Sequence, residues 1–162
     1  MNFFLATWCV FICFTTTFAY LKNDTQLWSH TLKLGAKTFF INFEAISFDD
    51  AIVFCRAHSM QLAAIENLNE NTILVKDLKK ISVDGTTELW TSGKKLNNSN
   101  DWIWLSTMDV IESFDWGAGE PNNEEGNEFC LAIYPNYYSS GSWNDANCQA
   151  LAYPICQSVS SN

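Results

Sequence analysis

The chain has 162 residues and a formal net charge of −9, from 18 Asp and Glu against 9 Lys and Arg. An acidic chain repels phosphate backbones, so the composition argues against a nucleic-acid partner. Its hydrophobic fraction, 48%, and its length are enough for one domain with its own core.

The first 19 residues are predicted to be a secretory signal peptide, cleaved after Ala19. Residues 1–16 carry no charge and are largely apolar, and Thr17 and Ala19 place small residues just before the expected cut, although a basic start is missing. A membrane anchor is disfavoured because the apolar run is short for a span of ~20 residues and polar residues follow at once. We expect a secreted, extracellular protein with no membrane partner.

Two of the six cysteines lie in this leader, and an even number remains in the predicted mature chain. An even number in an exported chain indicates two disulfides, although spacing alone does not choose among the three possible pairings. A zinc site is disfavoured because there is no CxxC pair and the two histidines are far from the C-terminal cysteines. The remaining cysteines are Cys55, Cys130, Cys148 and Cys156.

Residues 20–59 predict one strand and then one helix. Residues 20–32 form a short polar segment, and the aromatic and β-branched residues at 37–43 predict a strand. Ser47 is a suitable helix N-cap, and apolar residues follow it at helical spacing. The pattern predicts an amphipathic helix over 48–59, with Cys55 on or near its buried side.

Further elements follow before the texture of the sequence changes after Asp84-Gly85. The apolar run at 62–65 predicts a strand or connector, 69–81 a second helix, and 88–93 a short buried strand. Beyond this the chain is rich in Asn, Gly, Ser and Asp until the strands predicted at 131–134 and 152–156. A long ordered loop in a small domain needs anchors and usually carries function. The tryptophans expected to provide core anchors are Trp90, Trp102, Trp104, Trp116 and Trp143.

Five oxygen-bearing side chains lie in or beside this loop, and two cysteines punctuate them. Ca²⁺ prefers six to eight oxygen ligands from carboxylates, amides and backbone carbonyls. Clustered carboxylates repel one another unless a cation neutralises them. The remaining loop acids, Glu124 and Glu125, are expected to be solvated. The candidate ligands are Glu120, Asn122, Glu128, Asn144 and Asp145.

The sequence from about residue 33 to residue 157 resembles a C-type lectin domain. The resemblance implies an α+β fold with two helices packed on small antiparallel sheets and a long ordered calcium-binding loop. It divides the chain into the leader at 1–19, a short N-terminal segment at 20–32, the lectin domain at 33–157 and a short tail at 158–162. The residues that carry it are Cys55, Trp90, Glu120-Pro121-Asn122, Glu128-Phe129-Cys130, Trp143-Asn144-Asp145, Cys148 and Cys156.

The resemblance also implies covalent and metal chemistry. It pairs Cys55 with Cys156 and Cys130 with Cys148, and it places a cis peptide bond before Pro121. One Ca²⁺ would be bound by Glu120, Asn122, Glu128, Asn144 and Asp145, with two coordination positions left for adjacent sugar hydroxyls. The same five side chains would then form the carbohydrate-binding site.

The order Glu120, Pro121, Asn122 resembles the mannose-type subclass, which accepts mannose, fucose and N-acetylglucosamine. The expected partners are therefore glycans or glycoproteins. A second calcium ion is not expected, because the places of its acidic ligands hold Lys94 or Lys95, Asn123 and Phe129. Neighbouring residues that could bias the sugar preference are Glu124, Ala146, Tyr137 and Tyr138.

Alternative functions are a protein-binding C-type-lectin-like domain, with calcium structural or absent, and galactose-type specificity. The chain is not expected to be an enzyme, because no nucleophile–base signature is present and neither histidine lies near the loop. Asn23 and Asn97 head N-glycosylation sequons. The sequence does not set an oligomeric state.

Overall fold

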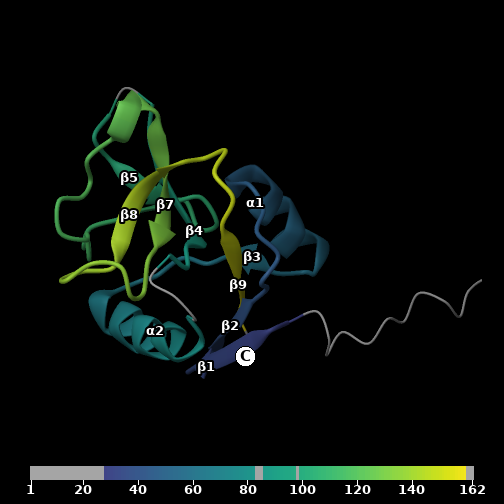
Figure 1. The fold of residues 1–162 in the computed structure, drawn as a ribbon. Coiled ribbons are helices and arrows are strands. Elements are labelled where there is room, and N and C mark those ends of the chain that lie inside the picture. Colours follow the sequence, from purple (N-terminus) through teal and green to yellow (C-terminus); the bar gives the residue numbers. More distant parts are fainter. Residues whose placement is uncertain (1–27, 83–85, 98, 160–162) are drawn as a thin grey trace, which may run out of the picture.

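The computed structural model describes residues 28–82, 86–97 and 99–159. The expected leader and the sequon at Asn23 lie outside the described residues. Two α-helices and several short strands follow one another along the chain (Figure 1). The elements are β1 (His30–Leu34), β2 (Lys37–Ile41), α1 (Phe48–Ala57), β3 (Gln61–Leu62), α2 (Leu68–Ile81), β4 (Leu89–Lys95), β5 (Trp102–Trp104), β6 (Asp109–Val110), the 3₁₀ turn η2 (Glu124–Gly126), β7 (Glu128–Ile133), β8 (Trp143–Asn147) and β9 (Tyr153–Val159).

Both helices begin where a polar side chain caps them. The Ser47 side chain accepts a hydrogen bond from the Asp50 backbone N–H at the start of α1, as the sequence predicts. Asn67 does the same for Glu70 at the start of α2. Helix α1 ends two residues earlier than predicted because Ser59 adopts a left-handed φ of 58°, which turns the chain out of the helix.

The strands form two connected groups. Strands β1, β2 and β9 pair antiparallel, with β3 on the far edge of β9, and strands β4 to β8 form the second group. The two groups meet where β4 runs parallel to β9, with Leu89 opposite Tyr153 and Trp90 opposite Pro154. The predicted α+β class is confirmed, but this parallel pair makes the sheet mixed instead of purely antiparallel.

The hydrophobic core surrounds these strands. Trp90 and Trp143 are almost completely buried, and the Trp90 indole N–H donates to the Ile46 carbonyl at 2.9 Å. Trp102 and Trp104 are also buried, as predicted. Trp116 is only partly buried, because it packs at the edge of the core and stacks on the exposed ring of Phe114, with ring centroids 5.4 Å apart. The tryptophans therefore provide core anchors for the long loop region.

Two disulfides join distant parts of this framework. Cys55–Cys156 links α1 to β9 across 101 residues of sequence, and Cys130–Cys148 links β7 to the turn after β8 across 18 residues. These are the pairings that the resemblance implies. The first closes the domain as a whole, and the second braces the strands that lead into and out of the candidate site.

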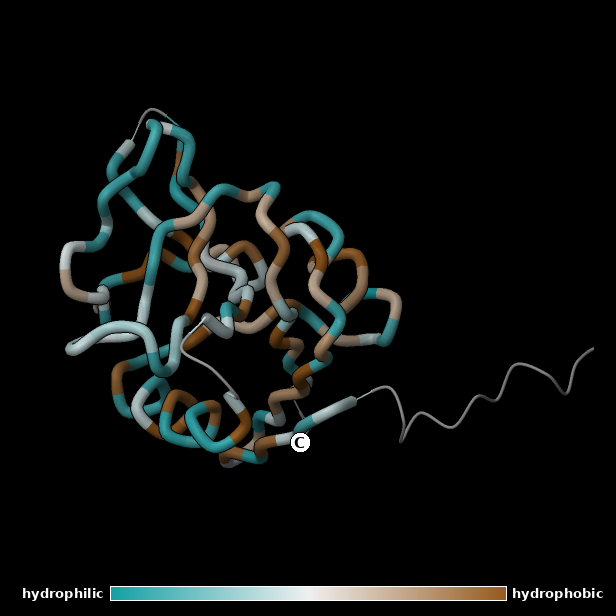
Figure 2. The backbone as a smooth tube through the Cα atoms, viewed as in Figure 1, coloured by the Kyte–Doolittle hydropathy of each residue, from teal (hydrophilic) through white to brown (hydrophobic). Residues whose placement is uncertain are grey.

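The long loop region is more regular than the sequence predicts. It contains β5 and β6, and Trp143-Asn144-Asp145 lie inside strand β8, where Asp145 pairs with Leu131 of β7. The part around η2 remains a hydrophilic loop at the end of the domain opposite β1 and β2, as Figures 1 and 2 show. Among the described residues, no helix is long and apolar enough to span a membrane.

Candidate functional site

The loop between Gly117 and β7 has a specific backbone geometry. The Glu120–Pro121 peptide bond is cis, as the resemblance implies, and the Glu120 N–H donates to the Gly117 carbonyl at 3.0 Å. Asn123 and Glu125 have positive φ values of 47° and 55°, which non-glycine residues rarely adopt. Residues held in such conformations often belong to functional loops, and this loop is fixed by contacts with charged side chains.

Asp145 on β8 is the central contact of the loop. Its side chain is fully buried, and its Oδ1 and Oδ2 accept hydrogen bonds from the backbone N–H groups of Asn122 and Asn123, both at 2.9 Å. A carboxylate accepts hydrogen bonds and does not donate them, so backbone N–H groups are well suited to satisfy it. One side chain of a regular strand therefore holds the Pro121–Asn123 turn in place.

Glu128 lies at the start of β7, on the other side of the turn. Its Oε2 accepts from the Glu124 backbone N–H at 2.7 Å. Burial is the largest influence and raises the Glu128 pKa; the Glu124 hydrogen bond acts in the opposite direction, and the nearby charges of Asp145, Glu120 and Glu124 raise it further. The net effect is a raised pKa, which indicates that these carboxylates share one site.

The third group joins Glu120 to Asn144. The phenol oxygen of Tyr138 lies 2.9 Å from Glu120 Oε1 and 2.9 Å from Asn144 Oδ1. Burial, followed by the hydrogen bond to Glu120, raises the Tyr138 pKa, so the phenol keeps its proton and can donate. The sequence identifies Tyr138 only as a possible influence on sugar preference. The concentration of tyrosines between Cys130 and Trp143 was the available signal for a larger role.

The structure thus brings the five predicted residues to one place. Asp145 contacts the backbone of Asn122, the Glu128 carboxylate experiences the charges of Asp145 and Glu120, and Tyr138 connects Glu120 to Asn144. Three carboxylates and two amides suit Ca²⁺, which binds oxygen ligands. Within the described part of the chain, no three or more His, Cys, Asp or Glu side chains are already grouped closely enough to hold a metal ion. The donor set fits calcium chemically, while its carboxylates are engaged by the loop backbone.

Lys94, Asn123 and Phe129 occupy the positions where acidic ligands of a second calcium ion are expected to be missing. In the structure these residues make other contacts or lack a suitable oxygen. The Lys94 ammonium lies 5.1 Å from the centroid of the Phe48 ring and 3.8 Å from the sulfurs of Cys130 and Cys148. Asn123 Oδ1 accepts from the Glu128 N–H at 3.1 Å. Phe129 is 37% exposed and has no oxygen in its side chain to offer a cation. A single calcium ion remains the prediction.

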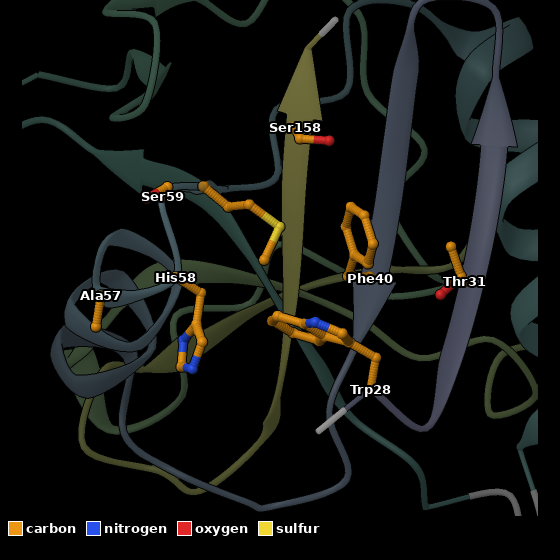
Figure 3. A pocket seen from close by; sticks show the side chains of 8 residues that line it. Trp28, Thr31, Phe40, Ala57, His58, Ser59 and Ser158 are labelled. Carbon is orange, nitrogen blue, oxygen red and sulfur yellow. The ribbon is translucent and has the colours of Figure 1, made fainter. Parts of the chain in front are cut away.

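A separate groove of about 790 Å³ lies beside the end of α1, against β1, β2 and β9 (Figure 3). Trp28, Phe40 and His58 line it, and the Trp28 ring lies 5.3 Å from Phe40 and 5.6 Å from His58. His58 is a packed histidine whose Nδ1 is 2.8 Å from the Phe54 carbonyl. No acidic side chain is among the described residues lining this groove, so it offers no comparable cation site.

Comparison with known proteins places this geometry in a family. The family described as "Lectin C-type domain" matches residues 44–158. E-selectin of the dog, Canis lupus familiaris, is 32% identical over 125 residues, which are 75% of this chain and 20% of the relative. The chain therefore spans about a fifth of the length of this curated relative.

Solved structures show the same fold. The mouse scavenger receptor C-type lectin carbohydrate-recognition domain matches with a TM-score of 0.66 and 25% identity, covering 82% of this chain and 98% of that chain. Herring type II antifreeze protein, at 23% identity, matches with a TM-score of 0.66 over the same shares of each chain, a similarity of fold alone. The prediction that the chain is not an enzyme is confirmed, because its lectin relatives are binding proteins. The described chain belongs to the C-type lectin domain family.

Proposed function

We propose that this domain is a secreted, calcium-dependent lectin that binds glycans through two adjacent sugar hydroxyls. The observation that carries the proposal is the arrangement around Asp145, which connects β8 to the turn containing Asn122. Glu120, Glu128 and Asn144 lie around the same turn and strand. The relatives support the glycan partner, since one of the similar structures is described as a carbohydrate-recognition domain.

The mixture of acids and amides suits a sugar diol. When bound, Ca²⁺ would supply coordination positions for hydroxyl lone pairs. The carboxylates of Glu120 and Glu128 would accept the hydroxyl hydrogens, and the amide N–H groups of Asn122 and Asn144 would donate to the hydroxyl oxygens. Acids alone could not do this, because an ionised carboxylate has no hydrogen to donate.

The preferred sugars in this proposal are mannose, fucose and N-acetylglucosamine. The support is the sequence order Glu120, Pro121, Asn122, which sets where the acid and the amide face a ligand hydroxyl. Exchanging the two polar groups, Glu120→Gln with Asn122→Asp, should move preference toward galactose. A variant that keeps its preference for mannose on a panel of immobilised monosaccharides would contradict this assignment.

The extracellular location is also part of the proposal. The leader-like residues before Ala19 and the two disulfides support export, because disulfides persist in oxidising compartments. Asn97 is exposed in the turn after β4, where a glycan could be accommodated. The domain is taken as residues 33–157, between the N-terminal segment and the short tail.

The test is retention on immobilised mannan in calcium and in EDTA. Wild-type protein should be retained in calcium and released by EDTA, and Asp145→Asn should not be retained in either condition. Glu125→Gln is the matched control, because Glu125 is an exposed acid of the same loop outside the proposed ligand set. Retention that EDTA does not disturb would refute the calcium–sugar mechanism.

A protein-binding domain is the second candidate function. The observation that favours it is the absence, among the described residues, of an acid group already arranged for a metal ion. The herring antifreeze protein illustrates that the fold alone does not decide function. A glycan array with no calcium-dependent signal, together with a protein ligand that binds equally in EDTA, would favour this alternative.

A further inference from the structure

Tyr138 contacts two of the proposed calcium ligands although it is not one of them. Its phenol oxygen is 2.9 Å from both Glu120 Oε1 and Asn144 Oδ1. These two residues come from different parts of the site, since Glu120 precedes the cis proline and Asn144 lies on strand β8. One hydroxyl therefore lies between the loop ligand and the strand ligand, and its single hydrogen is shared between the two acceptor oxygens.

The phenol reaches them from the protein side of the site. The Tyr138 ring lies directly against Gly117, where an added Cβ would be 2.4 Å from ring atoms Cγ and Cδ2. Gly117 is buried, and its N–H donates to the Trp143 carbonyl at 2.8 Å, so the backbone beneath the ring is fixed. The Tyr134 and Tyr137 rings pack around Tyr138, with centroids 6.0 Å and 4.9 Å away. The ring thus has a defined position, and its hydroxyl is directed at the ligands.

We propose that Tyr138 is a positioning residue that holds Glu120 and Asn144 in the orientation required to bind calcium. This inference rests on the proposed function of the same site. Each oxygen has two lone pairs, so an oxygen that accepts from the phenol still has one to give to a cation. Partners that orient metal ligands in this way commonly change metal affinity by about 10- to 100-fold when they are removed.

If Tyr138 instead competed with the sugar, removing its hydroxyl would strengthen sugar binding. Such a phenol would occupy the place of a sugar hydroxyl. The contact with the fixed backbone of Gly117 favours positioning over competition. The distinction can be made by measuring the calcium and sugar affinities separately.

The experiment is calorimetric titration of Tyr138→Phe with calcium, followed by titration of the calcium-saturated protein with methyl mannoside. The variant keeps the ring against Gly117 and loses only the hydroxyl. We expect calcium affinity to fall by about 10- to 100-fold. Sugar affinity at saturating calcium should stay within about twofold, because the ion then holds the ligands. Tyr137→Phe is the control, since Tyr137 is adjacent and 62% exposed, and it should bind calcium normally.

Gly117→Ala supplies a supporting variant, because its added Cβ would displace the Tyr138 ring; it is compared with Tyr138→Phe, since the Gly117 carbonyl also accepts from the Glu120 N–H. It should weaken calcium binding in the same direction, and cooperative melting in EDTA verifies that each variant is folded. Tyr138→Phe with unchanged or tighter calcium binding would overturn the inference, as would a variant that loses sugar affinity at saturating calcium. Wild-type protein that binds no calcium would overturn the proposed function as well.

Discussion

The framework and the site loop of this domain are stabilised by different interactions. Trp90, Leu131 and Ile155 are fully buried in the framework, so apolar burial holds that part together. Residues 121–127 of the site loop are all exposed. The loop has little apolar surface to bury, and its order depends on hydrogen bonds from its backbone to the carboxylates of Asp145, Glu128 and Glu120.

This difference has a consequence for ligand binding. The carboxylates that hold the loop are the same groups that a calcium ion would coordinate. Loop order and metal binding therefore depend on one set of side chains. Changes in the framework should alter mainly global stability, and changes in the site should alter local order and calcium affinity as well.

Removal of each disulfide should give the largest change in unfolding free energy and compares the framework with the site loop. Replacing Cys55 and Cys156 by Ala opens a connection across 101 residues, which in the loop-entropy model costs about 4.7 kcal/mol of unfolding free energy. Replacing Cys130 and Cys148 by Ala opens one across 18 residues and should cost about 3 kcal/mol. Urea unfolding in EDTA measures both values.

Calcium titration of the same two variants separates their roles. The variant without Cys55–Cys156 should keep the calcium affinity of its folded fraction, because that bridge is in the framework. The variant without Cys130–Cys148 should bind calcium more weakly, because the bridge joins β7 to the end of β8. Equal calcium affinities in the two variants would show that the loop does not need its own brace.

Much of the framework can be predicted from the sequence. Both helices follow from apolar periodicity and from polar residues at their starts, and Ser47 is a cap in the structure. The strands β5 and β6 are not predicted. They are only three and two residues long and lie in a segment rich in turn-forming residues. Strand β5 pairs with β4 and β6 pairs with β5, so their extent is set by tertiary pairing.

The composition of the candidate site can be predicted, but its connections cannot. Oxygen-bearing side chains at the spacing of Glu120, Asn122 and Glu128 identify the donor set, together with the resemblance. The sequence does not reveal that Asp145 accepts from the loop backbone, or that Tyr138 reaches Glu120 across 18 residues. Such contacts depend on how β8 pairs with β7, which sets the direction of each side chain.

A second, smaller test is Asp145→Asn in the absence of calcium. The substituted amide presents an NH₂ group to one of the two backbone N–H donors, so one buried hydrogen bond is replaced by a donor–donor contact. We expect a loss of about 1–3 kcal/mol, measured by urea unfolding in EDTA. Faster hydrogen exchange should be confined to the backbone N–H groups of Asn122 and Asn123.

Asp109→Asn is the control for this change, because Asp109 is an exposed acid on β6. It should alter stability by less than about 0.5 kcal/mol. An Asp145→Asn protein that is as stable as wild type, with unchanged exchange at the loop, would mean that the loop is held by contacts other than this carboxylate.

The smallest expected effect concerns Glu88, where the framework meets the tyrosines beside the site. Burial raises the Glu88 pKa, and a hydrogen bond from Tyr134 only partly offsets this influence. Within the described residues, its buried Oε1 atom has no hydrogen-bond partner. Ionised Glu88 is therefore poorly accommodated in the folded state, and the pH dependence of stability should reveal it.

The pKa of Glu88 in the folded state lies above its unfolded value of about 4.5. The stability that Glu88 contributes is therefore complete below that unfolded value and is lost as pH rises through the folded pKa. Glu88→Gln removes this titration. The variant should be more stable than wild type at pH 7, by about 1 kcal/mol, comparable to one hydrogen bond. The difference in unfolding free energy between the variant and wild type should become smaller as pH falls and stay constant below about pH 4.5, where Glu88 is protonated in both states. Urea unfolding at several pH values measures it, and a difference that does not change with pH would show that Glu88 ionisation does not strain the contact between framework and site.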